Sequence, residues 1–392
     1  MTQKLYWKTP YETKFRAKIE VIRENGIVLD KTLFYPESGN QISDRGYFRI
    51  KDLKIEVFHV VKDGEDILHQ VSPNSIKNFN IGDQVEGEID WKFRYGIMKA
   101  HTSQHIFSAV IKKKYDIDTE RANLSFEDVF IEFSQKVNYK QLNELLTEVN
   151  KICTTQNFKM NAKIIPREEA VKNSEKIRSV IPDNSNIRLM EIQDLDLVCC
   201  GGTHVKNTTE IGALLIYEFK KGKEIKYVVG NKALEMSTNL NIDLIDLAND
   251  INSSIIKLKE LLKKRLGLIK KIQNQNNELS FKLLELISKS PLKLINEIPL
   301  FLINFEVDIK TINKSLDNFP LNSLLIFKFE NNKIRILSLN EIINSNDLLQ
   351  KLINKFGGKG GGSPKSSQGY LTQMPEDLIA EIELLLLNRY VS

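Results

Sequence analysis

Short apolar runs rich in β-branched residues dominate residues 1–92, as in FRAKIEVI, GYFRI, LKIEVFHVV and ILHQV. Asn-Gly and Asp-Gly pairs separate some of these runs, and such pairs favour tight turns between strands. Regularly spaced short strands of this kind predict a small β-barrel. One longer stretch, LFYPESGNQISDRGYF at residues 33–48, is rich in Gly, Pro and Ser and predicts a loop between two strands.

A mixed pattern follows at residues 93–235. Near its start, WKFRYGIMKAHTSQHIFSAVIKKKY places apolar residues at helical spacing, whereas NAKIIP, LDLVCC and ALLIYEFK predict strands. The last part, residues 291–392, again alternates predicted strands such as SLLIFKFE with helices such as NSNDLLQKLINKF. This alternation predicts a C-terminal α/β domain. The chain as a whole is therefore predicted to be an α+β protein.

Between these parts, residues 236–290 carry apolar residues three and four positions apart, which predicts a long helix that pairs with another helix. The apolar seam consists of Leu244, Ala248, Ile251, Ile255, Leu258, Leu262, Ile269, Ile272, Leu279, Leu283 and Leu286. Polar Arg265 and Asn276 interrupt the seam, and such residues often fix the oligomeric state. We therefore expect a coiled-coil-like linker that forms a homodimer, with a helical hairpin inside one chain as the alternative.

The same segment also has a strongly basic stretch. Residues 257–271 hold seven Lys or Arg residues and a single acidic residue, Glu260. Such a run indicates either a solvated helix face or contact with a phosphate backbone.

Composition narrows the class of protein. The 392 residues are 41% hydrophobic and 27% charged, values typical of a soluble globular protein with two or three domains. Apolar runs stay below the roughly 18 residues that a membrane span needs. The first residues lack a signal pattern, so a cytoplasmic location is expected. The net charge of +5 permits a polyanionic partner without requiring one.

Three of the five histidines and two of the three cysteines lie in two short motifs, AHTSQHIF and CCGGTHV. His101 and His105 are four residues apart in a predicted helix, so both imidazoles lie on one face. Cys200 and His204 flank a Gly-Gly pair after a predicted strand. Three nitrogens and one sulfur suit a tetrahedral Zn²⁺ ion, and we expect one such ion per chain.

Other interpretations of these motifs fit less well. A lone HxxxH is often two unrelated histidines, but here the two motifs together use three of the five His and two of the three Cys. A zinc protease is excluded because its helix carries a Glu after the first His, where this chain has Thr102. The spacings are not those of a zinc finger. Cys199 alternates with Cys200 along the strand, so we expect it to point away from the metal as a buried thiol.

Three motifs together, FYPESGNQISDRG, AHTSQHIF and CCGGTHV, resemble the editing domain of alanyl-tRNA synthetases and of freestanding AlaX-type proteins. The segment DWKFRYGIMKAH is similar to the family's sequence before its HTxxH motif, and GGKGGGSP resembles the glycine motif of the synthetase's C-terminal domain. The resemblance covers nearly the whole chain. Because the predicted barrel begins near residue 13, we expect no aminoacylation domain, as in the long freestanding form of AlaX.

The resemblance implies an ATP-independent, zinc-dependent hydrolase that removes serine, and also glycine, from mischarged alanine tRNA. By position, the metal ligands would be His101, His105, Cys200 and His204. Catalysis would involve Thr102, Gln41 and Cys200, with Thr102 sensing the serine hydroxyl. The amino-acid pocket would also be lined by the loop Ser38, Gly39, Asn40 and Gln41, in which Asn40 replaces the family's commoner glycine. The tRNA would contact Gly357, Gly358, Lys359, Gly360, Gly361 and Gly362.

The chemistry behind this expectation is simple. A synthetase pocket for alanine cannot strongly reject a similar amino acid with one more hydroxyl, so a second, hydrolytic site is useful. Zinc in that site could activate a water or orient the substrate. Four protein ligands would leave no open position for a water, so either one ligand is displaced or the metal mainly orients the substrate. Two other functions stay open. One is a tRNA-binding factor with purely structural zinc, and the other is editing of another mischarged tRNA, such as threonine tRNA carrying serine.

Overall fold

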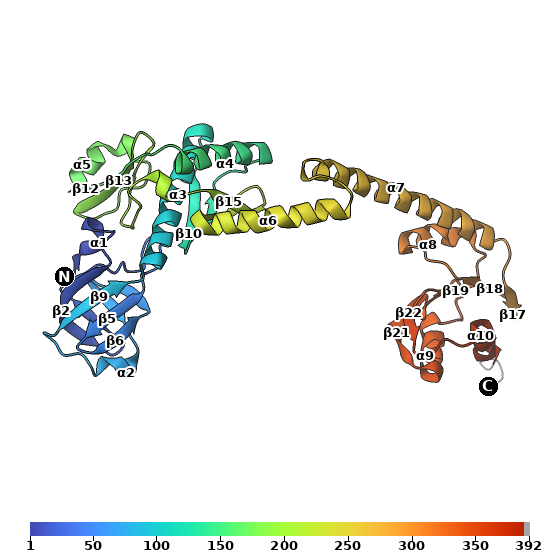
Figure 1. The fold of residues 1–392 in the computed structure, drawn as a ribbon. Coiled ribbons are helices and arrows are strands. Elements are labelled where there is room, and N and C mark those ends of the chain that lie inside the picture. The colour runs from blue at the N-terminus through green and yellow to red at the C-terminus, as the bar shows by residue number, and fades with distance from the viewer. Residues whose placement is uncertain (388–392) are drawn as a thin grey trace. The chain divides into compact units, whose positions relative to one another are not determined.

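The computed structural model describes residues 1–387 and divides into two compact units, Met1–Leu247 and Ala248–Ser392 (Figure 1). Each unit has its own hydrophobic core. The sequence-based division into residues 1–92, 93–235, 236–290 and 291–392 is finer than this and stays a prediction. The four metal ligands expected from the sequence all belong to the first unit.

The first unit begins with a seven-stranded antiparallel sheet in the order β6-β5-β9-β2-β3-β8-β7. Its strands are β2 (Lys14–Arg23), β3 (Gly26–Leu29), β5 (Gly46–Ile50), β6 (Leu53–Val57), β7 (His59–Asp63), β8 (Asp66–Gln70) and β9 (Gln84–Ile89). Alternate residues of β2 and β5 are buried, as expected for strands with one face on a core. Short flanking elements are β1 (Gln3–Lys4), α1 (Leu5–Lys8), β4 (Lys31–Thr32) and α2 (Pro73–Ile76).

The predicted barrel is wrong, because among the described residues this sheet stays open. Its edge strands β6 and β7 do not pair with each other. The long strand β2 pairs with β9 through Lys14–Lys18 and with β3 from Ile19 onward, and the register shifts between Ile19 and Val21. A bulge of this kind bends a sheet around a core without closing it. Strand alternation shows which residues face the core, but closure depends on a long-range pairing that it does not encode.

The loop at residues 33–45 lies between β4 and β5 and carries the motif FYPESGNQISDRG, as predicted. Its apolar start, Leu33 to Tyr35, is buried in the core of the sheet. The loop leaves the core at Glu37 and re-enters it at Gln41. It therefore brings the side chain of Gln41, followed by those of Ser43 and Asp44, into the interior.

The second half of this unit packs helices on a four-stranded antiparallel sheet in the order β10-β11-β16-β15. The strands are β10 (Thr119–Ser125), β11 (Asp128–Phe133), β15 (Leu214–Lys220) and β16 (Glu224–Val229), and the helices are α3 (Trp91–Tyr115) and α4 (Tyr139–Thr154). Helix α3 begins after Asp90, whose carboxylate accepts a hydrogen bond from the Phe93 N–H. Most of α3 is buried, so even its polar residues lie in the interior.

A small three-stranded sheet completes the first unit and leads into the second motif. It consists of β12 (Met160–Pro166), β13 (Asn186–Ile192) and β14 (Asp196–Cys199), with α5 (Arg167–Lys172) and the 3-10 turn η1 (Ser174–Lys176) beside it in the chain. Strand β14 ends at Cys199, so the turn with the second motif starts at Cys200 and runs to η2 (Thr208–Glu210).

The predicted long helix over residues 236–290 is two helices, α6 (Gly230–Asp250) and α7 (Ile255–Ile287). The break falls in the sequence Asn-Ser-Ser, and Asn252 adopts a positive φ of 53°, a conformation that Asn tolerates at helix ends. The apolar spacing continues across the break, which is why the sequence pattern did not reveal it. On α7 a row of apolar side chains is exposed, among them Leu266, Ile269, Ile272 and Leu279.

The second unit holds a six-stranded sheet in the order β17-β18-β19-β20-β22-β21. Its strands are β17 (Lys293–Ile295), β18 (Ile298–Ile303), β19 (Leu324–Lys328), β20 (Lys333–Ser338), β21 (Gly358–Gly362) and β22 (Ser366–Leu371). Its helical elements are α8 (Ile309–Ser315), η3 (Leu316–Asn318), α9 (Ser345–Phe356) and α10 (Leu378–Leu387), and α9 packs on β20, β21 and β22. This confirms a C-terminal unit of mixed strands and helices.

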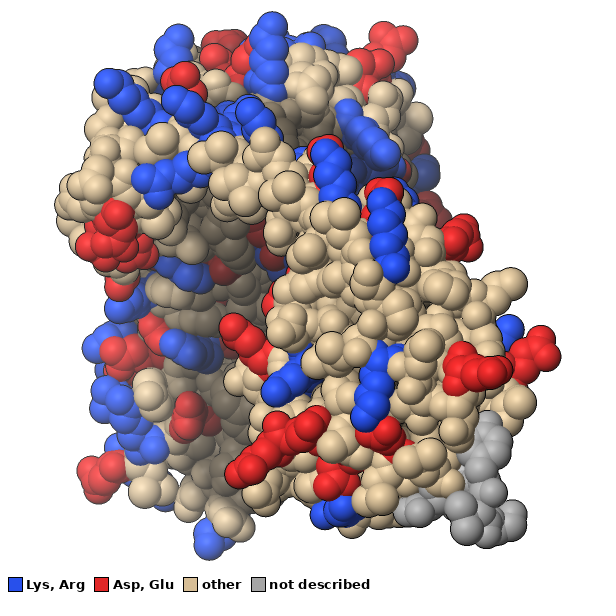
Figure 2. All heavy atoms as spheres, turned by 90° about the vertical axis from the view of Figure 1, so that its right-hand side faces the viewer, with Lys and Arg blue, Asp and Glu red and all other residues tan. Residues whose placement is uncertain are grey.

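The surface carries both signs of charge. On the face shown in Figure 2, Lys and Arg side chains are interspersed with Asp and Glu side chains. None of the helices within residues 1–387 combines the length and the apolar content needed to cross a membrane.

Candidate metal centre

The four predicted ligands meet at one point of the first unit. Helix α3 supplies His101 and His105, and the turn after β14 supplies Cys200 and His204. Their ligand atoms all lie within 4.8 Å of one another. The Cys200 Sγ lies 3.4 Å from the His101 Nε2 and 3.2 Å from the His204 Nε2. Residues about a hundred positions apart in the sequence therefore form one cluster of three nitrogens and a sulfur.

Burial keeps the three imidazoles neutral. It lowers the pKa of His101 to about 3, and it lowers the pKa values of His105 and His204 well below their usual value. A neutral imidazole has a lone pair free for a metal ion. Burial also raises the pKa of the Cys200 thiol, and a bound cation would oppose this by favouring the thiolate.

His105 gives the clearest sign that a metal ion fits this cluster. Neither of its ring nitrogens has a hydrogen-bond partner, although both are buried. A buried polar atom without a partner costs free energy, and a metal ion within the cluster would satisfy one of the two nitrogens. Three imidazoles and one thiolate form a donor set that Zn²⁺ takes in proteins. The residues present therefore fit the predicted ion.

Gln41 reaches this cluster from the loop of the N-terminal sheet. Its side chain is fully buried, and its Oε1 accepts hydrogen bonds from the His101 Nδ1 at 2.7 Å and from the Thr203 N–H at 3.1 Å. Its Nε2 donates to the Thr203 Oγ1 at 3.0 Å. One amide thus links the first histidine of α3 to the turn that carries the other ligands.

Thr102 supports His204 in the same way that Gln41 supports His101. Its hydroxyl oxygen lies 3.1 Å from the His204 Nδ1 and accepts a hydrogen bond from the Val205 N–H at 3.3 Å. A metal on Nε2 would leave the proton of His204 on Nδ1, facing this oxygen. Gln41 and Thr102, both expected to contact the substrate, thus lie behind two of the metal ligands in the structure. A direct contact of either residue with an amino acid stays a prediction.

The other predicted pocket residues lie on the outer side of the same loop. Ser38 is half-buried, and Gly39 and Asn40 are exposed. Gly39 and Asn40 have positive φ angles of 59° and 64°, which glycine adopts freely and Asn tolerates better than other residues. The replacement of glycine by Asn40 is therefore compatible with this turn. The Asn40 carbonyl accepts the Leu124 N–H at 3.1 Å, which ties the loop to β10.

A buried ion pair that the sequence analysis missed anchors this loop to α3. Arg94 and Asp44 are almost fully inaccessible, and Asp44 accepts hydrogen bonds from the Arg94 guanidinium and, at 2.6 Å, from the Tyr35 N–H. The guanidinium also donates to the Leu33 carbonyl at 2.5 Å. An arginine on an otherwise apolar helix face was the available signal, because a buried charge requires a partner.

Two further side chains hold the carbonyls of the CGGTH turn, and the sequence analysis missed both. The Arg188 Nη1 donates to the Cys200 carbonyl at 2.7 Å and to the Gly202 carbonyl at 3.0 Å. The Trp7 Nε1 donates to the Gly201 carbonyl at 2.7 Å. These hydrogen bonds join residues that are distant in the sequence, so no short sequence motif could have revealed them. The turn is thus fixed from two sides.

Cys199 lies outside the cluster, as predicted from strand alternation. It packs beside the small core of Ala170, Ile177, Ile187 and Leu189. It is half-buried rather than buried, and it lies on β14, the edge strand of its three-stranded sheet.

The glycine motif of the C-terminal unit forms the edge strand β21, paired with β22. A Cβ on Gly360 would come within 2.6 Å of the Gln368 carbonyl oxygen, so glycine there lets the two strands approach closely. Lys359 between the glycines is exposed. The structure therefore gives these glycines a packing role, and their contact with tRNA stays a prediction.

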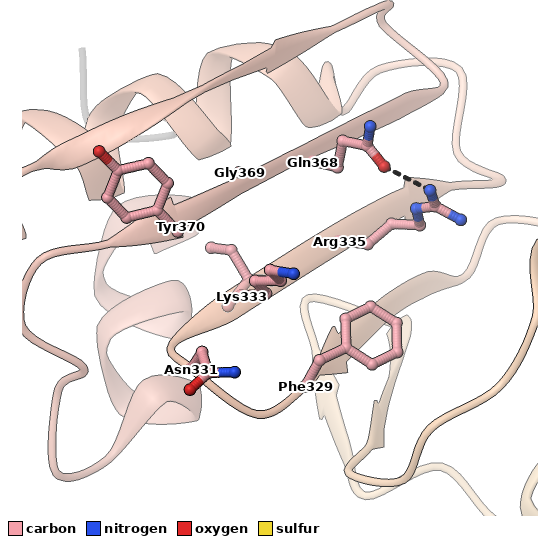
Figure 3. A pocket seen from close by; sticks show the side chains of 8 residues that line it. Phe329, Asn331, Lys333, Arg335, Gln368, Gly369 and Tyr370 are labelled. Atoms are coloured by element: carbon pink, nitrogen blue, oxygen red, sulfur yellow. Dashed lines mark hydrogen bonds between the residues drawn. The ribbon is translucent and has the colours of Figure 1, made fainter. Parts of the chain in front are cut away.

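A cavity of about 510 Å³ lies on the sheet beside this strand (Figure 3). Its lining includes Phe329, Asn331, Lys333, Arg335, Gln368 and Tyr370. Lys333 and Arg335 alternate along β20 with Ile334 and Ile336, which belong to the core against α9. The cavity therefore opens on the face of the sheet opposite α9. Arg335 donates a hydrogen bond to Gln368 of the neighbouring strand.

Comparisons with known proteins agree with this architecture. A family model described as class II (A) tRNA synthetases matches residues 3–93. A second model, described as the second additional domain of threonyl and alanyl tRNA synthetases, matches residues 187–229, which include the CGGTH turn. The class is thus that of proteins related to threonyl and alanyl tRNA synthetases.

Individual relatives identify the family within this class. The alanyl-tRNA editing protein AlaX-L of Pyrococcus horikoshii is 30% identical, and the match covers 96% of each chain. The alanyl-tRNA editing protein AlaX-M of Methanosarcina acetivorans is 34% identical over 57% of this chain and 96% of its own. An alanine–tRNA ligase of Sulfurisphaera tokodaii is 30% identical over 95% of this chain but only 42% of the ligase. The chain belongs to the AlaX-type alanyl-tRNA editing proteins, which confirms the resemblance seen in its motifs.

The two glycines of the turn should differ sharply in their tolerance of alanine. A Cβ at Gly202 would overlap the His101 Cε1 and lie 2.6 Å from the Gln41 Oε1, whereas a Cβ at Gly201 would meet only the Trp7 Cζ2, at an ordinary contact distance of 3.8 Å. If the cluster holds zinc, we expect Gly202→Ala to weaken its binding by about 10- to 100-fold, the usual effect of disturbing the surroundings of a metal ligand. Gly201→Ala should bind zinc like the unaltered protein.

Zinc affinity by competition with a coloured chelator measures the difference, and circular dichroism checks that both variants fold. Equal zinc affinity of the two variants would show that the turn does not hold the metal in the arrangement described.

Proposed function

We propose that this protein hydrolyses the ester between a wrongly attached amino acid and alanine tRNA, in the cytoplasm, with serine and also glycine as the amino acids removed. The observation that carries the proposal is the cluster of His101, His105, Cys200 and His204 in a chain of the AlaX-type family. The names of two relatives, alanyl-tRNA editing proteins, supply the substrate class.

The reaction needs only water and the charged tRNA. Water adds to the ester carbonyl, the bond between the carbonyl carbon and the ribose oxygen breaks, and the ribose oxygen takes up a proton. The products are the free amino acid and tRNA with a free terminal hydroxyl, so ATP is not consumed. Zinc held by these residues would supply Lewis-acid chemistry once one ligand gives up its place to the ester or to a water, because four protein ligands close the tetrahedron.

The chain's own residues would hold this site in shape. Cys200 is the one ligand residue that is not fully buried, so we place the entry for the ester beside it. Gln41 and Thr102 would act by orienting His101 and His204, since their polar atoms are already bonded to these rings. The half-exposed Ser38 and the neighbouring Gly39 and Asn40 would line the amino-acid pocket and recognise the serine hydroxyl.

Deacylation of alanine tRNA charged with serine, run beside the same tRNA charged with alanine, tests the reaction. We expect serine to be released more than about a hundred-fold faster than alanine, because a site that bonds a hydroxyl discriminates strongly against its absence. A zinc chelator should abolish the release, and Cys200→Ala should do the same while tRNA binding persists. Threonine tRNA charged with serine is the comparison substrate.

Each outcome separates the candidate functions. A folded, zinc-loaded protein that binds tRNA but releases no serine would contradict the proposal and favour a tRNA-binding factor with structural zinc. Faster release from threonine tRNA would instead assign the protein to editing for that tRNA.

We also propose that the cavity beside the glycine motif binds tRNA. The basic side chains of Lys333 and Arg335 can form ion pairs with phosphates of the tRNA, and the exposed ring of Tyr370 can stack on a base. Arg335→Gln combined with Tyr370→Ala should weaken tRNA binding several-fold and lower the salt dependence of the affinity. Lys351→Gln, on α9 at the other face of the sheet, is the matched control. Unchanged affinity of the double variant, measured by filter binding, would argue against this surface.

The exposed apolar row on α7 supports a third proposal, that a second copy of the chain covers this helix. Ile269 and Ile272 are 58% and 55% exposed. Single exposed apolar residues are common on a monomer, but a row of them along one helix indicates a surface that a partner covers. We expect light scattering to give twice the mass of one chain, and Ile269→Lys with Ile272→Lys to give the single mass. Lys264→Gln on the basic side of α7 should remain dimeric. A monomeric unaltered protein would contradict the proposal.

A further inference from the structure

Arg188 is a buried cation next to the candidate metal centre. It belongs to β13 and is 8% exposed. Of its nitrogens, only Nη1 makes hydrogen bonds within the described residues, to the Cys200 and Gly202 carbonyls at 2.7 and 3.0 Å, and its Cζ lies 5.8 Å from the centre of the Trp7 ring. A guanidinium has five N–H groups in a planar fork, so the Nε and Nη2 groups remain available.

Within residues 1–387 this guanidinium has no carboxylate within ion-pair distance, unlike the two other arginines of the site. Arg94 is paired with Asp44, and Arg178 is paired with Asp196 at 2.8 and 2.7 Å. The groups that interact electrostatically with Arg188 are instead Cys200, Tyr35 and Tyr6. The two tyrosines are neutral at pH 7, because burial raises both of their pKa values. A buried charge without a counter-charge is unfavourable, so its retention indicates an anionic ligand.

The charges around the cluster point the same way. The three imidazoles are neutral, and one thiolate would balance only half of the charge of a divalent ion. With the ion bound, the site and Arg188 together would carry two positive charges. Such a site attracts an anion.

We propose that Arg188 forms a phosphate-binding subsite at the edge of the metal centre and holds the 5′-phosphate of the nucleotide that bears the amino acid. The inference rests on the proposed function for the identity of that nucleotide. The terminal nucleotide of tRNA is an adenosine, and its phosphate is the anion nearest to the ester. The free edge of the guanidinium fork matches two phosphate oxygens, a geometry that a lysine cannot reproduce.

Binding of adenosine monophosphate, compared with adenosine, tests this subsite without a deacylation assay. We expect the zinc-loaded protein to bind the monophosphate at least ten-fold more tightly than adenosine in isothermal titration calorimetry. Arg188→Gln keeps amide donors for the turn but removes the charge, and it should abolish this preference. Arg188→Lys keeps the charge without the fork and should retain part of the preference.

Trp7→Phe is the matched control, because it removes the hydrogen bond to the Gly201 carbonyl but keeps the charge of Arg188 and an aromatic ring beside it. It should bind the monophosphate as the unaltered protein does, and zinc content is measured for every variant. An equal loss of the preference in Trp7→Phe and Arg188→Gln would reduce Arg188 to a residue that supports the turn, which overturns the proposal.

If Arg188→Gln does not fold, the nucleotide affinities of the unaltered protein still test the subsite. Equal affinity for adenosine and its monophosphate would overturn the subsite without any variant. Inorganic phosphate as a competitor shows whether the anion alone is bound or the nucleotide as a whole, and both outcomes require Arg188. A protein that binds the monophosphate through Arg188 but does not deacylate tRNA would keep the subsite and refute the proposed reaction.

Discussion

The buried ion pair between Arg94 and Asp44 fixes the loop of the N-terminal sheet against helix α3. Both side chains are almost inaccessible to water, so loss of either partner would leave a charge stranded in the interior. The pair lies two turns before His101 on the same helix. It therefore sets the distance between the loop, which carries Gln41, and the first ligand of the metal centre. The geometry of the centre depends on this junction of two parts of the chain.

The centre combines neutral ligands with a tightly bonded surrounding shell. Gln41 and Thr102 bond the ring nitrogens of His101 and His204 that face away from the sulfur, and Arg188 and Trp7 bond the carbonyls of the turn. Such partners fix the tautomer and the orientation of a ligand before a metal binds. His105 is the exception, with no partner on either nitrogen. It is the ligand whose burial is hardest to explain without a metal ion.

The sequence was most informative where function depends on residue type and short spacing. Two His four residues apart on a helix, and a Cys and a His across Gly-Gly, specified a cluster that the structure brings together. Strand runs and the C-terminal alternation were also visible. The barrel was wrong because closure is a long-range pairing, and the single linker helix was wrong because its apolar spacing crosses the break at Asn252. Arg94, Arg188 and Trp7 were missed because their partners lie far away in sequence.

The central claim is that the N-terminal loop completes the metal centre through Gln41, and the zinc affinity of Gln41→Leu tests it most directly. Asn40→Gly, at the position next to Gln41, is the control. Glycine adopts the positive φ of residue 40 freely, and the Asn40 side chain is exposed and makes no contact with the cluster. We predict a loss of zinc affinity of about 10- to 100-fold for Gln41→Leu and none for Asn40→Gly. Unchanged zinc affinity of Gln41→Leu, with serine no longer distinguished from alanine, would contradict the account and place Gln41 in contact with the substrate.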